Sequence, residues 1–215
     1  MTFMKKYAIG LSLLALMAAA LLQGCAHKGP ILTDFAYQVP QAAVQETGRV
    51  AVGVGPFKDS RGKTDSVAGK RFGAMDDEVN DLVVQGTVSE KVTAALKAAL
   101  KTHGLSVRDS AGWDLTEADI PANGTKIIMS GEIKTLWIEA LSSFANTKVT
   151  AKVELRILVA DTEQKKVIRT LNVNSTIERQ AVAYSRGLVQ NTLSEALSAA
   201  LNQIFSDEEL RKTLF

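Results

Sequence analysis

The sequence contains one cysteine and two histidines among 215 residues, and these shortages exclude several classes of protein. A single cysteine has no partner in the chain, so no internal disulfide crosslinks the fold. Nucleophilic catalysis needs a base beside the nucleophile, and His103, the only histidine beyond the first 30 residues, falls where a helix is expected to end. No serine lies in a nucleophile-elbow pattern. We therefore predict no catalytic residues and no enzyme activity.

Glycine-rich phosphate loops and metal-binding patterns are also missing. The stretch Gly62-Lys63-Thr64 resembles the end of a phosphate loop, but the glycine required five residues before Gly62 is replaced by Phe57. One acidic group has the oxygen ligands that calcium prefers, yet its spacing matches no calcium loop, so we interpret it as a solvated surface. We expect neither a cofactor nor a metal. The acidic group comprises Asp76, Asp77, Glu78 and Asp81.

The longest apolar run is too short for an ordinary transmembrane helix. It extends from Tyr7 to Leu22 behind Lys5 and Lys6, whereas a spanning helix needs about 20 apolar residues. Residues 1–24 are therefore interpreted as a secretory leader. The run closes at Leu22-Gln23-Gly24-Cys25, which predicts cleavage before Cys25 and lipidation of that residue. The alternative is an ordinary leader cut at an Ala-x-Ala-type site, with Cys25 incidental.

This motif resembles the lipobox of bacterial lipoproteins, although Gln23 is not the small residue usual before the glycine. The resemblance implies a thioether-linked diacylglycerol and an amide-linked acyl chain, such as palmitate, on Cys25. Several chains make a lasting membrane anchor, because each buried methylene contributes about 0.8 kcal/mol. Ala26 follows the cysteine in place of an aspartate. By the same resemblance, this favours the outer membrane, with the protein facing the periplasm.

The charge balance excludes a nucleic-acid partner once the leader is set aside. The whole chain has 25 Lys and Arg residues against 23 Asp and Glu residues. The leader holds two of the lysines and no acidic residue, so the remaining chain has 23 of each sign. The slight basicity therefore belongs to the leader, and no basic surface for nucleic acid is expected.

Composition divides the rest of the chain into a tether and one domain. Residues 25–48 contain Pro30, Pro40 and polar residues without a sustained period, so we predict a flexible tether that spans about 25 Å on average. Residues 49–215 are long enough for a single domain with its own core.

Hydrophobic periodicity gives the expected elements of that domain. Strict alternation in the long strands indicates one buried face and one wet face, and two short connections indicate an antiparallel meander. Two helices carry apolar stripes, and Thr87-x-x-Glu90 and Ser206-x-x-Glu209 are capping boxes. We therefore predict an α+β domain, with a mostly antiparallel sheet and two amphipathic helices packed on one face, in two layers. The expected strands are residues 49–54, 105–107, 126–138, 147–160 and 166–178, and the helices are 87–103, 189–205 and a short one after 206.

The segment from Phe57 to Gln85 is polar, glycine-rich and without strong periodicity. Irregular segments of this length are uncommon in compact domains unless they are functional or disordered. Because simple linkers lack aromatics such as Phe72, we predict a recognition loop that docks on the domain, with Asp59 and Arg61 paired locally. A floppy insertion is the alternative.

A second candidate surface lies between two predicted strands. Alternation can bury only half of its large apolar residues on one face, so they either cap the helices or form a patch that faces a partner or lipid. The apolar residues are Leu136, Trp137, Ile138, Leu141 and Phe144. From both regions we take Asp59, Arg61, Phe72, Trp137 and Phe144 as candidate partner contacts.

The layout of the whole chain resembles the YajG-like bacterial lipoproteins. That resemblance rests on the lipobox and on four further features, and it implies fold and location but no catalytic residues. It implies a lipid-anchored, non-enzymatic binding or accessory module with a protein partner in the cell envelope. A looser similarity, to auxiliary lipoprotein subunits of ABC-type lipid transporters, implies an apolar groove instead. The four features are Asp59-x-Arg61, His103-Gly104-Leu105, Lys152-Val153-Glu154-Leu155, and Leu201 to Leu214 with Asp207.

Overall fold

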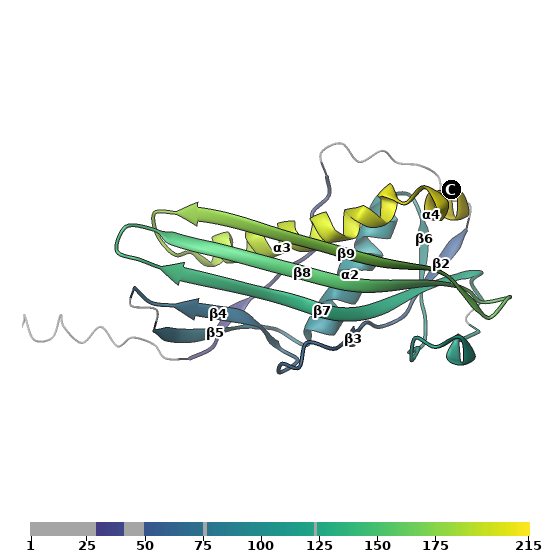
Figure 1. Cartoon of the computed structure of the whole chain (residues 1–215), viewed down its shortest axis with the longest axis horizontal. Coiled ribbons are helices and arrows are strands. Elements are labelled where there is room, and N and C mark those ends of the chain that lie inside the picture. The colour runs from purple at the N-terminus through teal and green to yellow at the C-terminus, as the bar shows by residue number, and fades with distance from the viewer. Residues whose placement is uncertain (1–28, 41–49, 75–76, 123) are drawn as a thin grey trace, which may run out of the picture.

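The computed structural model describes residues 29–40, 50–74, 77–122 and 124–215. The predicted leader and lipobox, with Leu22 to Cys25, lie outside the described residues, and so does Asp76 of the acidic group. The described chain forms one curled mixed sheet of nine strands with three α-helices (Figure 1). None of the helices described is both long enough and apolar enough to span a bilayer.

Along the described chain, five short strands come before one α-helix, a sixth short strand follows it, and three long strands precede two further α-helices. The strands are β1 (Ile31–Thr33), β2 (Ala51–Val54), β3 (Lys58–Asp59), β4 (Val67–Phe72), β5 (Glu78–Val84), β6 (Ser106–Asp109), β7 (Ile127–Ser142), β8 (Thr147–Asp161) and β9 (Lys166–Ala181). The helices are α2 (Val88–Thr102), α3 (Arg186–Asn202) and α4 (Glu208–Leu214), with 3-10 turns at Glu117–Asp119 and Gln203–Ser206.

The three long strands form the antiparallel meander that the alternation predicts. Strand β8 pairs antiparallel with β7 on one side and with β9 on the other. Val153 and Leu155 face the core, while Lys152, just before Val153, faces solvent. A shift of register between Ile133 and Thr135 of β7 places Ile133 and Leu136 on the same buried face. This β-bulge explains how two apolar residues three positions apart share one side of a strand.

On the other edge of β7, the strand pairing differs from the predicted antiparallel arrangement. Strands β2, β3 and β4 pair with it one after another, and all three run parallel to it. Strand β6 adds in parallel to β2, β5 adds antiparallel to β4, and β1 adds in parallel to β5. The expectation of a mostly antiparallel sheet with two helices on one face is therefore wrong, because five of these pairings are parallel and the sheet is mixed. The short helix expected after residue 206 is present as α4.

The predicted irregular loop between Phe57 and Gln85 is also corrected, since it contains β3, β4 and β5. These strands escape a pattern search for a physical reason. Strand β3 has two residues, and the buried residues of β4 are the small Ala68 and Gly69. A methyl group on Gly69 would lie 1.9 Å from the Ile138 carbonyl oxygen, so β4 and β7 approach too closely for a side chain there.

The helices cover one face of the sheet (Figure 1) and close the main core. Helix α2 begins after Thr87 with the predicted capping box and is followed by Gly104, whose φ of 82° supplies the left-handed stop. Helix α4 differs from the prediction in its cap. Asp207, rather than Ser206, accepts the hydrogen bond from the Leu210 backbone N–H at 2.8 Å.

Residues 29–40, which fall within the predicted tether, lie against the domain. Strand β1 extends the sheet, Phe35 is buried, and the backbone N–H groups of Ala36 and Gln38 donate to the side-chain hydroxyls of Ser194 (3.2 Å) and Ser198 (2.7 Å) on α3. Only residues 26–28 separate Cys25 from this docked segment in the sequence.

Candidate functional site

The outer face of the sheet, opposite the helices, carries a groove of about 610 Å³. It lies over β7 and β8 and is bordered by the segment that leads from β3 into β4. Its floor is formed by the outward-facing residues of the two long strands, which the alternation predicts to be wet. The lining residues are Arg61, Lys63, Lys70, Lys134, Thr135, Leu136, Trp137, Glu139, Thr150 and Lys152.

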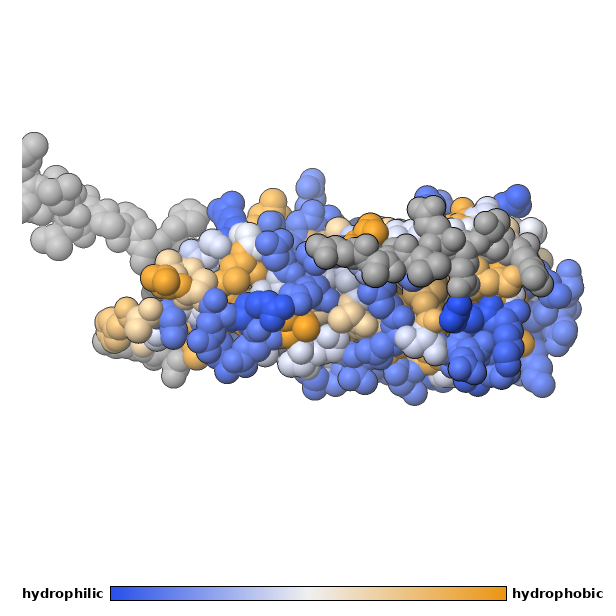
Figure 2. Space-filling model, turned by 90° about the horizontal axis from the view of Figure 1, so that it is seen from above, coloured by the Kyte–Doolittle hydropathy of each residue, from blue (hydrophilic) through white to orange (hydrophobic). Residues whose placement is uncertain are grey.

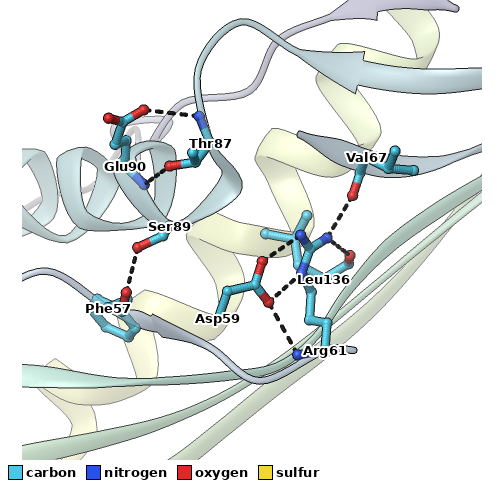
Figure 3. A network of polar contacts seen from close by, with 8 residues as sticks. All are labelled: Phe57, Asp59, Arg61, Val67, Thr87, Ser89, Glu90 and Leu136. Carbon is cyan, nitrogen blue, oxygen red and sulfur yellow. Dashed lines mark hydrogen bonds and ion pairs between the residues drawn. The ribbon is translucent and has the colours of Figure 1, made fainter. Parts of the chain in front are cut away.

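Arg61 fixes the border of this groove. Its side chain is only 3% exposed, and its guanidinium binds both carboxylate oxygens of Asp59, at 2.8 and 2.6 Å. It also donates to the carbonyl oxygens of Val67 (2.7 Å) and Leu136 (3.2 Å), as Figure 3 shows. One side chain therefore ties the β3–β4 connection to β7, and the predicted local pairing with Asp59 is present.

The pKa of Asp59 reflects this contact. Burial of the carboxyl group would raise its pKa, but the hydrogen bonds and positive charge of Arg61 outweigh burial and lower the pKa below its ordinary value of 3.8. The carboxylate is therefore ionised at neutral pH and holds the guanidinium in place. The pair acts as a structural clasp beside the groove, because Arg61 exposes almost none of its surface to a partner.

Trp137 provides the aromatic part of the floor. Its indole Nε1–H donates to Glu139 at 3.1 Å, and the Lys63 ammonium lies 5.2 Å from the ring centroid. A cation at this distance is attracted by the ring quadrupole. Lys63, from the β3–β4 connection, therefore lies over the ring of Trp137 on β7, and both side chains are accessible from the groove.

The lining is rich in positive charge, with five cationic side chains and one carboxylate, that of Glu139. Acidic residues just outside the lining neutralise part of it. Lys70 pairs with Glu78, Lys134 with Glu132 and Lys152 with Glu154, in addition to Arg61 with Asp59. Exposed pairs of this kind are weak, with a typical contribution of about 0–1 kcal/mol each. An incoming anion could therefore compete for these lysines at little cost.

Two of these carboxylates, Glu132 and Glu154, have pKa values below their ordinary range. A hydrogen bond from Lys152, followed by one from Thr135, lowers the pKa of Glu154. A hydrogen bond from Lys134 likewise lowers the pKa of Glu132, against a smaller effect of burial. Both groups lie close to cations rather than to an apolar wall, so neither is tuned toward neutral pH as a general acid would be.

Phe72 lies at the end of the groove that faces the β7–β8 hairpin. It lines a second hollow of about 420 Å³ with Leu141, Lys148 and Thr150, which continues the first along the same face. The register sets Phe72 opposite Leu141. The structure thus brings Arg61, Phe72 and Trp137 of the candidate contacts onto one surface.

Phe144 is not part of that surface. It lies in the β7–β8 turn and is 90% exposed, away from the groove lining. Leu136 and Ile138 belong to the core, so the predicted apolar cluster divides into core residues, groove residues and a separate tip.

The lysines and threonines of the groove could not be recognised as a site from the sequence. Lys134, Lys152 and Thr150 are visible as outward positions of the long strands, but alternation gives no sign that residues near Lys63 pass over them. The described residues contain no group of three or more His, Cys, Asp or Glu side chains able to hold a metal ion. The groove offers charge, hydroxyl groups and an indole, which suit reversible binding.

The far end of the outer face is covered. Trp113 and Ile120, from the segment after β6, pack on Ile128, Leu158 and Ala160 in a small second core. On β7 and β8, this second core therefore separates the groove from the far end of the outer face.

No protein-family model matches this sequence, and no curated protein matches it either. Among solved structures, a Xanthomonas campestris protein of the family DUF330 matches with a TM-score of 0.51 and 9% identity, over 82% of this chain and 90% of its own. At this identity the likeness shows a shared fold only.

Two weaker matches are proteins whose names describe bacterial lipoproteins. A minor lipoprotein from Acinetobacter baumannii has a TM-score of 0.40 at 9% identity, over 76% of this chain and 94% of its own. Lipoprotein GNA1162 from Neisseria meningitidis has a TM-score of 0.33 at 14% identity, over 73% of this chain and 99% of its own. Both scores are too low to support an argument, and the specific resemblance to YajG-like proteins stays a prediction.

Proposed function

We propose that this protein is a non-enzymatic binding module of the bacterial cell envelope, anchored at the outer membrane through a lipidated Cys25. The outer-face groove would receive a negatively charged segment of a periplasmic or membrane protein. The observation that carries this proposal is the groove lining, in which four lysines and one tryptophan accompany a single carboxylate, that of Glu139.

The geometry favours recognition of an extended acidic segment. The groove and its continuation beside Phe72 follow the direction of β7 and β8, so a chain could lie along the strands. Lys63 over Trp137 offers a cation and an aromatic face together. Charge complementarity of this kind speeds association and selects partners more than it adds affinity. Among the described groove residues there is no histidine or cysteine beside a hydroxyl, which supports binding over covalent chemistry.

A role as an auxiliary subunit of a lipid transporter has less support. A lipid-carrying groove should be lined mainly by apolar side chains. The groove here exposes lysines along both long strands, and its apolar residues are confined to Trp137, Leu136 and the hollow beside Phe72. The proposal therefore keeps to a protein partner.

Site-specific photo-crosslinking in living cells tests the groove. A benzoylphenylalanine at Thr150, in the floor, should form a discrete adduct with an envelope protein, whereas one at Glu163, in the β8–β9 turn, should not. Reversing the charge of Lys63 and Lys152 to glutamate should abolish the adduct, because an acidic segment would then meet like charges. The matched control is Lys166→Glu, an exposed lysine at the other end of the sheet.

Two results would contradict the proposal. One is an adduct at Thr150 that persists at full strength in the Lys63→Glu, Lys152→Glu variant. The other is the absence of any adduct from Thr150 while the protein is folded and present at normal abundance. Separately, metabolic labelling with a palmitate analogue tests the anchor, and a Cys25→Ser variant should lose all label.

A further inference from the structure

The end of the domain formed by the β7–β8 hairpin exposes large apolar side chains. Phe144, in the hairpin turn, is 90% exposed, Val182, just after β9, is 89% exposed, and Leu141 is 40% exposed. Hydrophobic side chains also gather at this end in the space-filling view (Figure 2). We call Leu141, Phe144 and Val182 the apolar tip. Contiguous exposed apolar groups mark an interaction surface.

The sheet register places these three residues together. Ser142 pairs with Thr147, and Thr147 pairs with Ala181, so the hairpin turn and the end of β9 lie side by side. Phe144 and Val182 therefore project beyond the last paired residues of neighbouring strands. The helices do not cover these two side chains, because they pack on the core face farther along the sheet.

The described chain begins at this same end of the molecule (Figure 1, purple). The Gly29 carbonyl accepts a hydrogen bond of 2.6 Å from Asn80 of β5, and Asn80, Arg71 and Ala140 form one row across β5, β4 and β7. Strand β1 is parallel to β5, which is antiparallel to β4, while β4 is parallel to β7. Strand β1 therefore runs away from the tip, and its start faces the tip.

The chain from this row to Cys25 and the chain from this row to Phe144 are nearly equal in length. Cys25 lies four residues before Gly29, and four residues can span at most about 14 Å. Phe144 lies four residues beyond Ala140, which shares the row with Asn80 and Arg71, and a strand of that length rises about 13 Å. A lipid anchor at Cys25 therefore keeps the row of Asn80, Arg71 and Ala140 within about 14 Å of the bilayer surface. The apolar tip extends nearly as far beyond this row, so it can reach that surface.

We propose that the apolar tip enters the bilayer interface, with Phe144 and Val182 as its contacts with lipid. This inference rests on the proposed lipidation of Cys25 and commits the tip to a lipid surface. Behind the tip, the guanidinium of Arg71 lies 4.2 Å from the ring centroid of Tyr184. Aromatic and basic side chains at this depth are those found at the level of lipid headgroups.

Spin labelling of the intact lipoprotein tests the inference. Cys25 is the only cysteine and its thiol is consumed by lipidation, so one introduced cysteine gives a unique labelling site. We would label Phe144→Cys, Val182→Cys and, as the matched control in the turn at the opposite end of β8, Glu163→Cys. All three side chains are exposed, so folding should tolerate each change. The lipoproteins would be reconstituted into phosphatidylethanolamine and phosphatidylglycerol vesicles.

Accessibility of the labels to oxygen and to a water-soluble nickel complex then decides the matter. The inference expects the labels at positions 144 and 182 to favour oxygen over nickel by at least about fivefold relative to the label at 163, because oxygen concentrates in lipid. Labels at 144 and 182 that are as open to nickel as the control overturn it. Labels shielded from both agents overturn it too, since they would indicate contact with a second protein copy.

Mass spectrometry of the same samples separates this inference from the proposed function. An acylated Cys25 with water-exposed tip labels means that the anchor stands and only the membrane contact of the tip fails. A protein without acyl chains means that the proposed anchor itself fails, and the inference falls with it.

Discussion

Replacing Arg61 by alanine should show how much the clasp beside the groove contributes to the fold. The change removes four hydrogen bonds from one guanidinium and leaves the Asp59 carboxylate and the carbonyl groups of Val67 and Leu136 without that partner. The β3–β4 connection would then lose its link to β7.

The structure gives a magnitude for this loss. Breaking a buried ion pair by removing one partner costs about 3–5 kcal/mol, because an uncompensated charge remains. The Asp59 side chain keeps 12% of its surface exposed, so water can partly solvate it. We therefore expect Arg61→Ala to lower the free energy of unfolding by about 3 kcal/mol. Asp59→Asn should cost less, since the carbonyl contacts of Arg61 remain.

Urea unfolding of the protein produced without residues 1–24 provides the measurement, with an unchanged m-value as the sign that only stability has altered. A double-mutant cycle of Asp59→Asn and Arg61→Ala isolates the pair, and a coupling of at least about 1 kcal/mol is expected for groups in direct contact. If Arg61→Ala costs less than about 1 kcal/mol, the guanidinium is not a clasp and the reasoning from its burial is refuted.

The same pair makes a prediction about pH. The folded-state pKa of Asp59 lies below its ordinary value of 3.8, so folding favours the ionised form. The stability from this shift is fully present above pH 3.8 and is lost as pH falls through the lower folded-state pKa. Between neutral pH and that window, Asp59→Asn should differ from the wild type by a constant amount, and the difference should shrink below it.

Two further predictions concern packing. Leu155 is a core residue of β8, so Leu155→Ala should cost about 2–5 kcal/mol in urea unfolding, whereas Lys152→Ala on the outer face should stay within about 0.5 kcal/mol; equal costs would mean that the outer face is covered. Gly69→Ala would set a methyl group 1.9 Å from the Ile138 carbonyl oxygen and should cost about 3 kcal/mol, while Gly187→Ala, with no atom within 4 Å, should stabilise α3 by about 0.5 kcal/mol. Tolerance of Gly69→Ala would contradict the close pairing of β4 with β7.

Elements whose signals are local could be predicted from the sequence. The alternation of β8 extends from Thr147 to Arg156, and this is long enough to mark a strand with one buried face. The capping box at Thr87 and the glycine at 104 mark α2 to within one or two residues. The three long strands are joined by short turns, so their antiparallel order follows from the connections alone.

Parallel pairing could not be predicted because its determinants lie far apart in the chain. Strand β4 meets β7 some 70 residues later, and the contact depends on the missing side chain of Gly69 and on its neighbour Ala68. Small residues in a polar stretch indicate a loop when the partner strand is not known from the sequence. The bulge near Lys134 has the same effect on a smaller scale, since it breaks the alternation of β7 with no glycine or proline between Ile133 and Thr135 to mark it.

The candidate site was accessible to sequence reasoning only in part. Asp59 and Arg61 are two residues apart, so their pairing follows from proximity along the chain. The meeting of Lys63 with Trp137 joins residues 74 positions apart and follows from the parallel pairing of β3 with β7. The separation of Phe144 from the groove depends on how far the hairpin extends beyond β4.

The two proposals together predict where the partner is met. Trp137 lies seven residues before Phe144, which is about 23 Å along a strand. A domain whose tip rests on the bilayer would therefore hold the groove roughly 25 Å from the membrane surface, open to the side. A partner that is itself embedded in the same membrane could reach the groove at this height. Lengthening the chain between residues 28 and 29 should then weaken the contact, because the domain would no longer be held at a fixed height.

A 20-residue Gly-Ser insertion at that position adds a mean span of about 25 Å, comparable with the height of the groove. We expect the photo-crosslinked adduct from Thr150 to fall severalfold in the lengthened protein, while palmitate labelling and abundance stay as in the wild type. The control is the same insertion within the β8–β9 turn at Glu163, which leaves the distance from Cys25 to Gly29 unchanged. An adduct of equal yield in both proteins would mean that the partner is not confined to the membrane surface, because the height of the groove would then be irrelevant to the encounter.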